Sequence, residues 1–217
     1  MLGLHVTVPV ACFRKGMARE YLETEPLPPP ATCYGFLLSM VGETDRRRHI
    51  GARVTAGLLN QPDTSVVLRT VWRVKKQPLG SSGNTRPDYQ QLLTGSELVI
   101  WLDSSEETKP GTRLEDRVRE VLDPDRRLAV SRFGGLSLGE STHLVDSVLL
   151  LDRAGLPADQ QCRLFLIASR GRLTLPVWVD HVGSAGTRQV VGNLEKHTLT
   201  PPDVKRVPVI APPGGAA

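Results

Sequence analysis

Aromatic residues and cysteines are both scarce in this sequence. Phe, Trp and Tyr make up 5% of the chain, which excludes a binding face built as a broad aromatic platform. The three cysteines, Cys12, Cys33 and Cys162, are far apart and form neither a CxxC pair nor the Cys/His spacing of a zinc site. We therefore expect reduced, buried thiols in a cytoplasmic protein, with no metal and no cofactor.

Long hydrophobic runs are missing as well. No apolar segment approaches the roughly 20 residues needed to cross a bilayer, so we expect no membrane partner. The N-terminal stretch MLGLHVTVPVACFRKG carries its charges after the apolar run, whereas a signal peptide carries them before it. Its alternating, β-branched residues predict a strand over Leu2–Phe13.

The chain does contain enough apolar material for a core, and its positive charge is carried mostly by arginine. Its 217 residues are 40% hydrophobic, which suits one domain with a small elaboration. The formal net charge is +4. Arginine pairs bidentately with phosphate, so this composition is compatible with a nucleic-acid partner, although many soluble proteins share it.

The order of the predicted elements is that of an α+β domain. Pro28–Pro30 lead into a helix over residues 31–41 that is apolar on nearly all sides and ends at Gly42. The following segments predict strands over 52–60 and 65–75, an irregular insertion over 76–95, a strand over 96–103 and an amphipathic helix over 112–122. This order is close to a ferredoxin-like layout.

The second part of the chain predicts a small β-rich elaboration. Apolar strands are expected near residues 146–151, 162–168 and 173–182. We therefore divide the chain into a first domain over 1–145, which includes the insertion 76–95, and a C-terminal elaboration over 146–206. The Pro/Gly/Ala-rich end, 207–217, predicts a disordered tail.

A cationic loop follows the first predicted strand. Arg14, Lys15 and Arg19 lie there, with Tyr21 nearby. Such a loop could hold a phosphate backbone and stack a base on the tyrosine. An ordinary solvated loop is the alternative.

Cations also recur along one strand. Arg69, Arg73 and Lys75 share a face with Val71, and Lys76 follows them. Like charges side by side on a strand cost stability unless an anion pairs with them. This pattern is the strongest indication of nucleic-acid binding that the residues give by themselves.

A glycine-rich segment, RFGGLSLGESTH, runs from Arg132 to His143. Gly135–Gly139 matches the G-x-S-x-G nucleophile elbow, with Ser137 as the nucleophile. An elbow needs a helix after the serine, but the following residues predict a strand, so a serine hydrolase is a minor alternative. The others are a turn whose backbone N–H groups approach a phosphate, and a tight turn without a ligand.

Together, three segments resemble a known family. ACFRKG, PPPATCYGFLLSMVGE and RFGGLSLGES are similar to the Cas-five-type subunit of type I CRISPR effector complexes, and most similar to its I-B-like branch. The resemblance extends from Leu2 to about Val182. It implies an RRM-like, ferredoxin-like core with a thumb insertion.

The resemblance also implies a function. Such a subunit caps the 5′ handle of the CRISPR RNA (crRNA) in Cascade and contacts the backbone subunit and the large subunit. The complex targets DNA by guide pairing, in defence or in guided transposition, and this subunit supports the target near its PAM-proximal end.

The site residues follow from the same resemblance. Arg14, Lys15 and Arg19 would meet handle phosphates, with Tyr21 beside them. The backbone of Phe133, Gly134 and Gly135, next to Arg132, would approach the handle nucleotides. The expected RNA contacts at the base of the thumb are Arg69, Arg73, Lys75 and Lys76.

One branch of the family cuts precursor RNA with a Tyr, Lys and His set. The available residues are Tyr21 or Tyr34 with Lys196 and His197, and the last two fall late in the chain. A metal-independent endoribonuclease therefore stays an alternative. The sequence favours a binding subunit without catalysis.

Overall fold

The computed structural model describes residues 1–16, 21–72, 78, 80–126, 130–132, 134–157, 159–182 and 184–214. In these residues the elements follow in the order β1 (Leu2–Ala11), β2 (Tyr21–Leu22), α1 (Pro30–Met40), β3 (Arg53–Leu58), β4 (Asp63–Trp72), β5 (Thr85–Asp103), α2 (Leu114–Leu122), β6 (Ser147–Leu150), β7 (Gln161–Ile167), β8 (Leu173–Trp178) and β9 (Arg188–Thr198). Short 3₁₀ turns lie at Ser82–Asn84, Leu151–Arg153 and Val204–Arg206.

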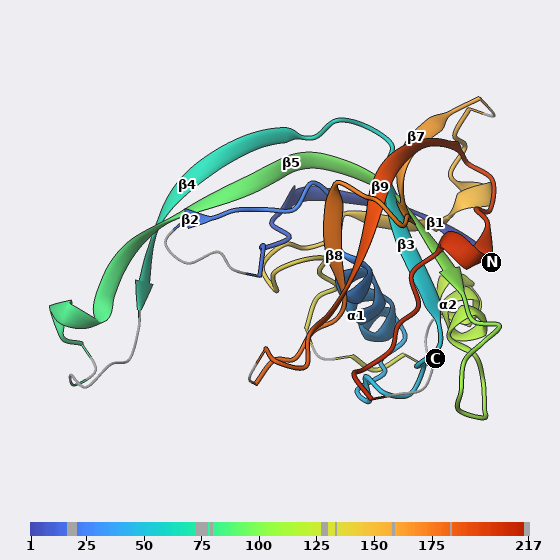
Figure 1. Ribbon diagram of the computed structural model, residues 1–217, viewed down its shortest axis with the longest axis horizontal. Coiled ribbons are helices and arrows are strands. Elements are labelled where there is room, and N and C mark those ends of the chain that lie inside the picture. The colour runs from blue at the N-terminus through green and yellow to red at the C-terminus, as the bar shows by residue number, and fades with distance from the viewer. Residues whose placement is uncertain are drawn as a thin grey trace.

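The described strands form one mostly antiparallel sheet. Its order is β6-β1-β5-β3-β7-β9-β8, and both β2 and β4 pair with β5 outside this path. Of these pairings, only β2 with β5 is parallel. With two helices beside the sheet, the predicted α+β class is confirmed (Figure 1). The strand β6, which opens the predicted C-terminal elaboration, pairs with β1.

The main core lies between the sheet and the helices. Leu4 and Val6 of β1 and Leu37 of α1 are fully buried in it. Helix α1 contacts β3, β8 and α2, so the strands of the chain's C-terminal part cover the side of the helix that the central sheet leaves open. This double cover explains why the sequence of α1 is apolar nearly all round.

A second, smaller core lies on the other face of β5. Val99 and Trp101 pack there against Cys162, Leu164 and Leu166 of β7. Residues 99 and 101 alternate with Leu98, Ile100 and Leu102, which belong to the main core. This half of β5 is therefore buried on both faces. All three cysteines are free and buried, as the sequence predicts.

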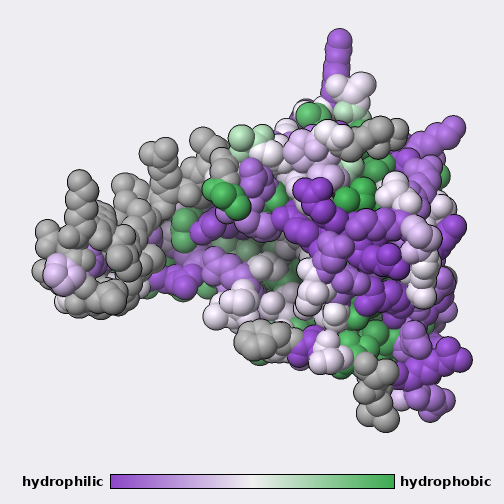
Figure 2. Space-filling view, turned by 90° about the horizontal axis from the view of Figure 1, so that it is seen from below, coloured by the Kyte–Doolittle hydropathy of each residue, from purple (hydrophilic) through white to green (hydrophobic). Residues whose placement is uncertain are grey.

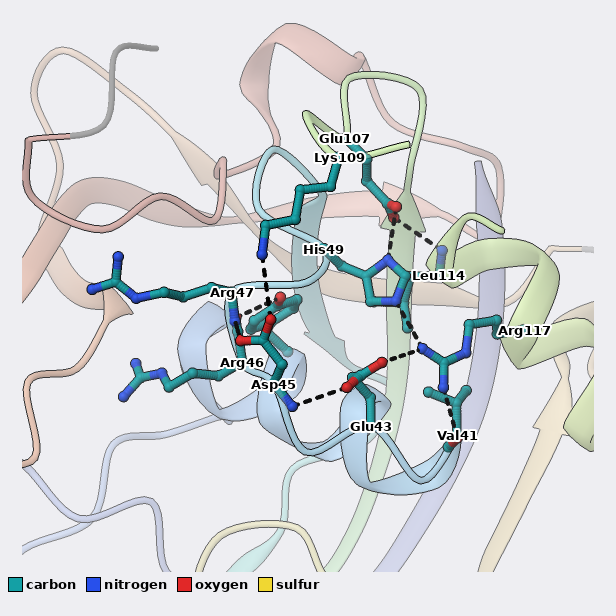
Figure 3. A network of polar contacts seen from close by, with 11 residues as sticks. Val41, Glu43, Asp45, Arg46, Arg47, His49, Glu107, Lys109, Leu114 and Arg117 are labelled. Carbon is teal, nitrogen blue, oxygen red and sulfur yellow. Dashed lines mark hydrogen bonds and ion pairs between the residues drawn. The ribbon is translucent and has the colours of Figure 1, made fainter. Parts of the chain in front are cut away.

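A polar network braces the two helices (Figure 3). His49 Nδ1 donates to Glu107 at 2.7 Å, and Arg117 donates to His49 Nε2 at 3.1 Å and to Glu43 at 2.6 Å. Arg117 also donates to the carbonyl of Val41, the C-cap of α1, at 3.1 Å. The end of α1 is thus tied to α2.

Glu107 also accepts the N–H of Leu114, at the start of α2, at 3.0 Å. Burial alone would raise the pKa of Glu107, but hydrogen bonds from His49, Ser104 and Leu114 outweigh it and lower the pKa below its usual value. The carboxylate is consequently held ionised in a nearly closed site, with its side chain 4% exposed.

The predicted insertion is largely a strand. Residues 85–95, expected to be irregular, belong to β5, which pairs with β4 from Thr85 with Trp72 to Thr94 with Asp63. We call β4 and Thr85–Thr94 of β5 the arm, because they extend away from the body of the molecule (Figure 1). The sequence did not predict this strand because few of its residues are hydrophobic, since the arm has no core to face. Residues 76, 77 and 79 of the insertion lie outside the described residues.

The predicted disordered tail is ordered at its start. Val207, Ile210 and Ala211 are buried, and Val209 bridges to Arg53 of β3. Ile210 exchanges backbone hydrogen bonds with Gly51 and Ala52, at 2.9 and 2.8 Å. Prolines in this segment suggested disorder, but the segment still pairs with the start of β3, where the N–H of Val54 donates to the carbonyl of Pro208 at 3.0 Å.

Candidate nucleic-acid interface

The cationic loop after β1 returns alongside that strand. The N–H of Phe13 donates to Thr24 Oγ1 at 2.8 Å, and Arg14 forms a bridge with Thr24. Lys15 Nζ lies 3.8 Å from the Glu23 carboxylate. Arg14 is therefore the exposed cation of this loop for which no internal ion pair is seen among the described residues.

The glycine-rich segment forms a tight turn over residues 136–145. The N–H of Val145 donates to the carbonyl of Leu136 at 3.0 Å, and the N–H of Leu138 donates to that of His143 at 3.1 Å. Gly139 has φ +102°, and a Cβ there would lie 2.8 Å from the carbonyl oxygen of Cys12. Glycine is thus required where the turn meets the end of β1.

His143 locks this turn onto β1. Its Nδ1 accepts the N–H of Cys12 at 3.1 Å and that of Glu140 at 3.4 Å. An Nδ1 that accepts hydrogen bonds carries no proton, so the ring is neutral with its proton on Nε2. Burial lowers the pKa of His143, which favours the same neutral state.

The segment is not a nucleophile elbow. Ser137 forms a bridge with Leu144, and residues 134–150, all of them described, lead from the turn directly into β6. An elbow would need a helix after the serine. The match of GLSLG to the hydrolase motif is accidental.

The turn also contacts the arm. The Glu140 carboxylate accepts hydrogen bonds from Gln90 of β5 at 3.0 Å and from Arg69 of β4 at 3.2 Å, and Arg69 donates to Gln90 as well. The cationic strand face was expected to pair with an anion. At Arg69 that anion is the Glu140 carboxylate of the same chain. Arg69 holds the arm to the body.

A cleft joins these parts. It has a volume of about 720 Å³, and its walls include Arg14, the turn residues Gly139–Ser141, Thr32 at the start of α1, and His181 after β8. A neighbouring cavity of about 390 Å³ shares Thr32, Gly139 and His181 with it. Two segments that the sequence singled out separately, the loop after β1 and the glycine-rich segment, thus face one cleft.

The start of α1 adds positive potential to the cleft. No side chain caps the helix and no acidic residue lies in its first turn, while Pro29 and Thr32 line the cleft. The prolines at this end have no N–H, and the N–H groups of Thr32 and Cys33 both donate to the carbonyl of Pro29 at 2.9 Å, so the helix dipole is what makes this end favourable for an anion. Three acidic residues lie on the walls. Glu140 pairs with Arg69, and Asp180 accepts the N–H groups of Val182 and Gly186. Burial raises the pKa of Glu25, while nearby Lys15 acts in the opposite direction.

The structure does not bring all the predicted site residues together. Tyr21 lies on β2, beside the arm. Arg132 lines a separate apolar pocket of about 310 Å³ with Met40 and Val148. Gly134 and Gly135 are exposed next to Arg132. The remaining predicted residues, Arg19, Arg73, Lys75, Lys76 and Phe133, lie outside the described residues.

The candidate ribonuclease residues are dispersed as well. Tyr34 donates to the carbonyl of Arg46 at 2.9 Å, and burial raises its pKa. Lys196 and His197 pair with Arg163 and Cys162 in the β7–β9 ladder. Neither of them lines the cavity that contains Tyr34.

Two further wall residues were not among the predicted RNA contacts. Arg46 lies with its guanidinium 3.8 Å from the centre of the Trp178 ring and donates to Val179 at 2.8 Å, which fixes β8 against α1. His181 is exposed and lines both cavities. The place of both residues on the wall depends on how β8 folds back over α1.

No group of three or more His, Cys, Asp or Glu side chains in the described part of the chain is placed to hold a metal ion. Among the described helices, none combines the length and apolarity of a membrane span.

Two solved structures have a similar fold. The fold resembles that of a chain titled "CRISPR RNA-guided surveillance complex", with a TM-score of 0.61, 13% identity and 91% of each chain covered. It also resembles "Crystal structure of Cas protein", with a TM-score of 0.52, 15% identity, and 96% and 97% covered. No family model matches the chain.

A relative with high sequence identity gives the family. The chain is 57% identical over 219 residues, all of both sequences, to "CRISPR-associated protein Cas5" of Myxococcus xanthus (strain DK1622). The chain therefore belongs to the Cas5 family, as the three sequence segments predicted.

Proposed function

We propose that this protein is the crRNA-binding subunit that caps the 5′ handle in a type I CRISPR effector complex. Membership in the Cas5 family and the likeness to a chain of a surveillance complex support its place in such a complex. It would work in the cytoplasm, without catalysis, and contact the backbone subunit, the large subunit and target DNA near the PAM-proximal end.

The cleft carries this proposal. It combines an exposed arginine, a helix start without a side-chain cap and a turn whose Gly139 is exposed on the cleft wall. Each of these features suits a phosphate or a splayed nucleotide, and none needs a regular duplex. A short single-stranded handle of fixed sequence is the RNA that fits such an irregular surface.

We also propose that the core is the ferredoxin-like, RRM-like fold that the sequence predicted. The elements β1-α1-β3-β5-α2-β6 follow the β-α-β-β-α-β order, and their strands lie in the order β6-β1-β5-β3. The arm would be the thumb of this fold.

The other RNA contacts remain part of the proposal. We expect Lys15 and Tyr21 beside Arg14, and Arg132, Gly134 and Gly135 on the flank of the glycine turn. Arg69 would act indirectly, because its contact with Glu140 holds the arm in position. Arg19, Arg73, Lys75, Lys76 and Phe133 complete the expected set.

The test is the RNA that the protein carries in its assembled complex. The chain is co-expressed with the other complex proteins and a CRISPR array, and the 5′ ends of the co-purified RNA are sequenced. We expect one shared handle, which Arg14→Glu with Lys15→Glu should reduce at least tenfold. Binding of a handle oligonucleotide should weaken steeply with salt.

A matched control reverses the same amount of charge elsewhere. Arg170 and Arg172 are exposed in the turn between β7 and β8. Their double change to Glu should leave handle recovery within about twofold. RNA without a shared 5′ end, or equal loss in both double variants, would refute the cap.

A further inference from the structure

One acidic residue on the cleft wall has no internal partner. Glu25 lies between β2 and α1, and its backbone N–H donates to the carbonyl of Phe13 at 2.8 Å, which fixes it beside the end of β1. The other acids of the wall, Glu140 and Asp180, are held by Arg69 and by backbone N–H groups. Within the described part of the chain, no hydrogen bond or ion pair is formed by the Glu25 carboxylate.

The position of Glu25 is not that of an ordinary surface acid. Hydrophilic residues cover much of the face that Figure 2 shows, and a carboxylate in open solvent is satisfied by water. Glu25 is only partly exposed, and its burial raises its pKa. Lys15 acts in the opposite direction, but it forms its ion pair with Glu23. A partly desolvated carboxylate without a partner is costly, so we expect its hydrogen-bond donors to come from a ligand.

The features of the cleft that suit a phosphate do not account for Glu25. Arg14 and the dipole at the start of α1 favour an anion, whereas a carboxylate repels one. An ionised carboxylate only accepts hydrogen bonds. A ligand must therefore present donors at Glu25, and in RNA these are the N–H groups of the bases and the 2′-hydroxyl.

The two free oxygens of the Glu25 carboxylate discriminate among these donors. Two adjacent N–H groups satisfy a carboxylate best, because each oxygen then accepts one of two parallel hydrogen bonds. On its Watson–Crick edge, guanine has N1–H next to the N2 amino group. Adenine and cytosine have an acceptor nitrogen beside their amino group, uracil has carbonyls on both sides of N3–H, and a 2′-hydroxyl supplies a single donor. Guanine is therefore the base that matches Glu25.

The cleft also has room for a base. Its volume is about 720 Å³, and Pro176 and Val179 contribute apolar surface to its walls. Apolar walls with a few polar groups that fix orientation are the usual make-up of a ligand site. The scarcity of aromatic residues does not oppose this, since a base edge is recognised here by hydrogen bonds rather than by a ring.

From the unpartnered carboxylate, the surrounding positive potential and the room in the cleft, we propose that Glu25 recognises one guanine base of the 5′ handle by accepting hydrogen bonds from its N1–H and its N2 amino group. This inference rests on the proposed function, because it concerns handle RNA in the same cleft. Arg14 holds the phosphates and positions the RNA, while Glu25 determines which base is accepted.

The test measures which handle base the complex selects. The complex is assembled from its co-expressed proteins on an equal mixture of two synthetic guide RNAs that differ at one handle guanosine. Mass spectrometry of the recovered RNA gives the ratio of the two guides. At one position we expect guanosine to be preferred about fivefold over inosine, which lacks the N2 amino group, and about tenfold over adenosine.

A conservative variant should change this preference. The amide of Glu25→Gln offers one donor and one acceptor, which match the adenine edge and not the guanine edge. The complex with Glu25→Gln should recover adenosine at least as well as guanosine at that position, and it should lose the preference over inosine. Glu23→Gln is the matched control, because it removes the same charge from an exposed residue two positions away. It should keep the preference for guanosine.

Several results would overturn the proposal. They are a shared handle without guanine, equal recovery of all paired guides by the unchanged protein, and a preference for guanosine that persists in Glu25→Gln. Loss of protein subunits from Glu25→Gln with an intact guanosine preference would show that the carboxylate pairs with a cation of a partner protein instead. The first two results need no variant, so they decide the question even if Glu25→Gln does not fold.

Failure of the function and failure of this inference are distinguishable. If the assembled complex carries no RNA with a shared 5′ end, the cap fails, and base recognition by Glu25 fails with it. If a shared handle is recovered but no guanine position depends on Glu25, the cap stands and the base recognition fails.

Discussion

The two halves of β5 share one strand and have opposite surroundings. Residues 98–102 are at most 3% exposed and face a core on each side, whereas Tyr89 in the arm half is 54% exposed. The buried half pairs with β1 and β3, and the arm half pairs with β4 along its whole length. Backbone pairing alone therefore decides that a strand forms, while burial decides how much it contributes to stability.

The largest expected effect comes from truncating the buried half. Ile100→Ala removes a fully buried side chain and should lower the free energy of unfolding by about 2–5 kcal/mol. Leu68→Ala in the arm should change it by about 0.5 kcal/mol or less. Urea unfolding of both variants measures the contrast, and equal losses would show that the arm belongs to the folding core.

The buried network should be the next most sensitive feature. Glu107→Ala leaves His49 Nδ1 and the Leu114 N–H without their acceptor, which should cost about 2 kcal/mol. The neighbouring Glu106 is 60% exposed in its ion pair with Arg53, so Glu106→Ala should cost about 1 kcal/mol or less. Urea unfolding at neutral pH compares the two, and an equal cost would contradict the bracing role of the network.

The lowered pKa of Glu107 predicts how the stability of the protein responds to acid. Because the pKa of Glu107 is lower in the folded protein than in the unfolded chain, its contribution is complete above the usual glutamate value of about 4.3. It is lost as the pH falls through the lower, folded value. Glu107→Ala should therefore flatten the acid limb of the stability curve, and Glu106→Ala should leave it steep.

A smaller effect is expected where the arm meets the body. Glu140→Ala removes the acceptor of both Arg69 and Gln90, at a cost of about 1 kcal/mol for this partly exposed contact. Hydrogen exchange should show faster exchange of the arm amides in this variant and unchanged exchange at residues 98–102. Equal acceleration in both halves of β5 would mean that they open together.

The smallest effect should be the titration of His143. Burial lowers its pKa in the folded protein, so the unfolded chain binds the proton more readily. Stability should fall as the pH drops below the usual histidine value of about 6.5, until the folded value is passed. His143→Asn, whose amide oxygen can accept the Cys12 N–H, should reduce this dependence below about pH 6.5. An unchanged slope would exclude His143 as its source.

The sequence by itself determined the elements with strong local signals. The alternation of β1, the proline start and glycine end of α1, the apolar strand at 96–103 and the stripe of α2 were read correctly, because each carries its own period or cap. Three quoted segments were also sufficient to predict membership in the Cas5 family. The sequence singled out Arg14 and the glycine turn, but not the cleft between them.

Only the tertiary structure decided the rest. The arm half of β5 and the ordered segment after Val207 carry weak local signals, and they are held by pairing with β4 and β3. Arg69 looked like a free cation until Glu140, 71 residues away, was placed beside it. The physical reason is common to these cases: short-range preferences report what a segment can form, and contacts between distant segments determine which charges are neutralised and which faces stay open.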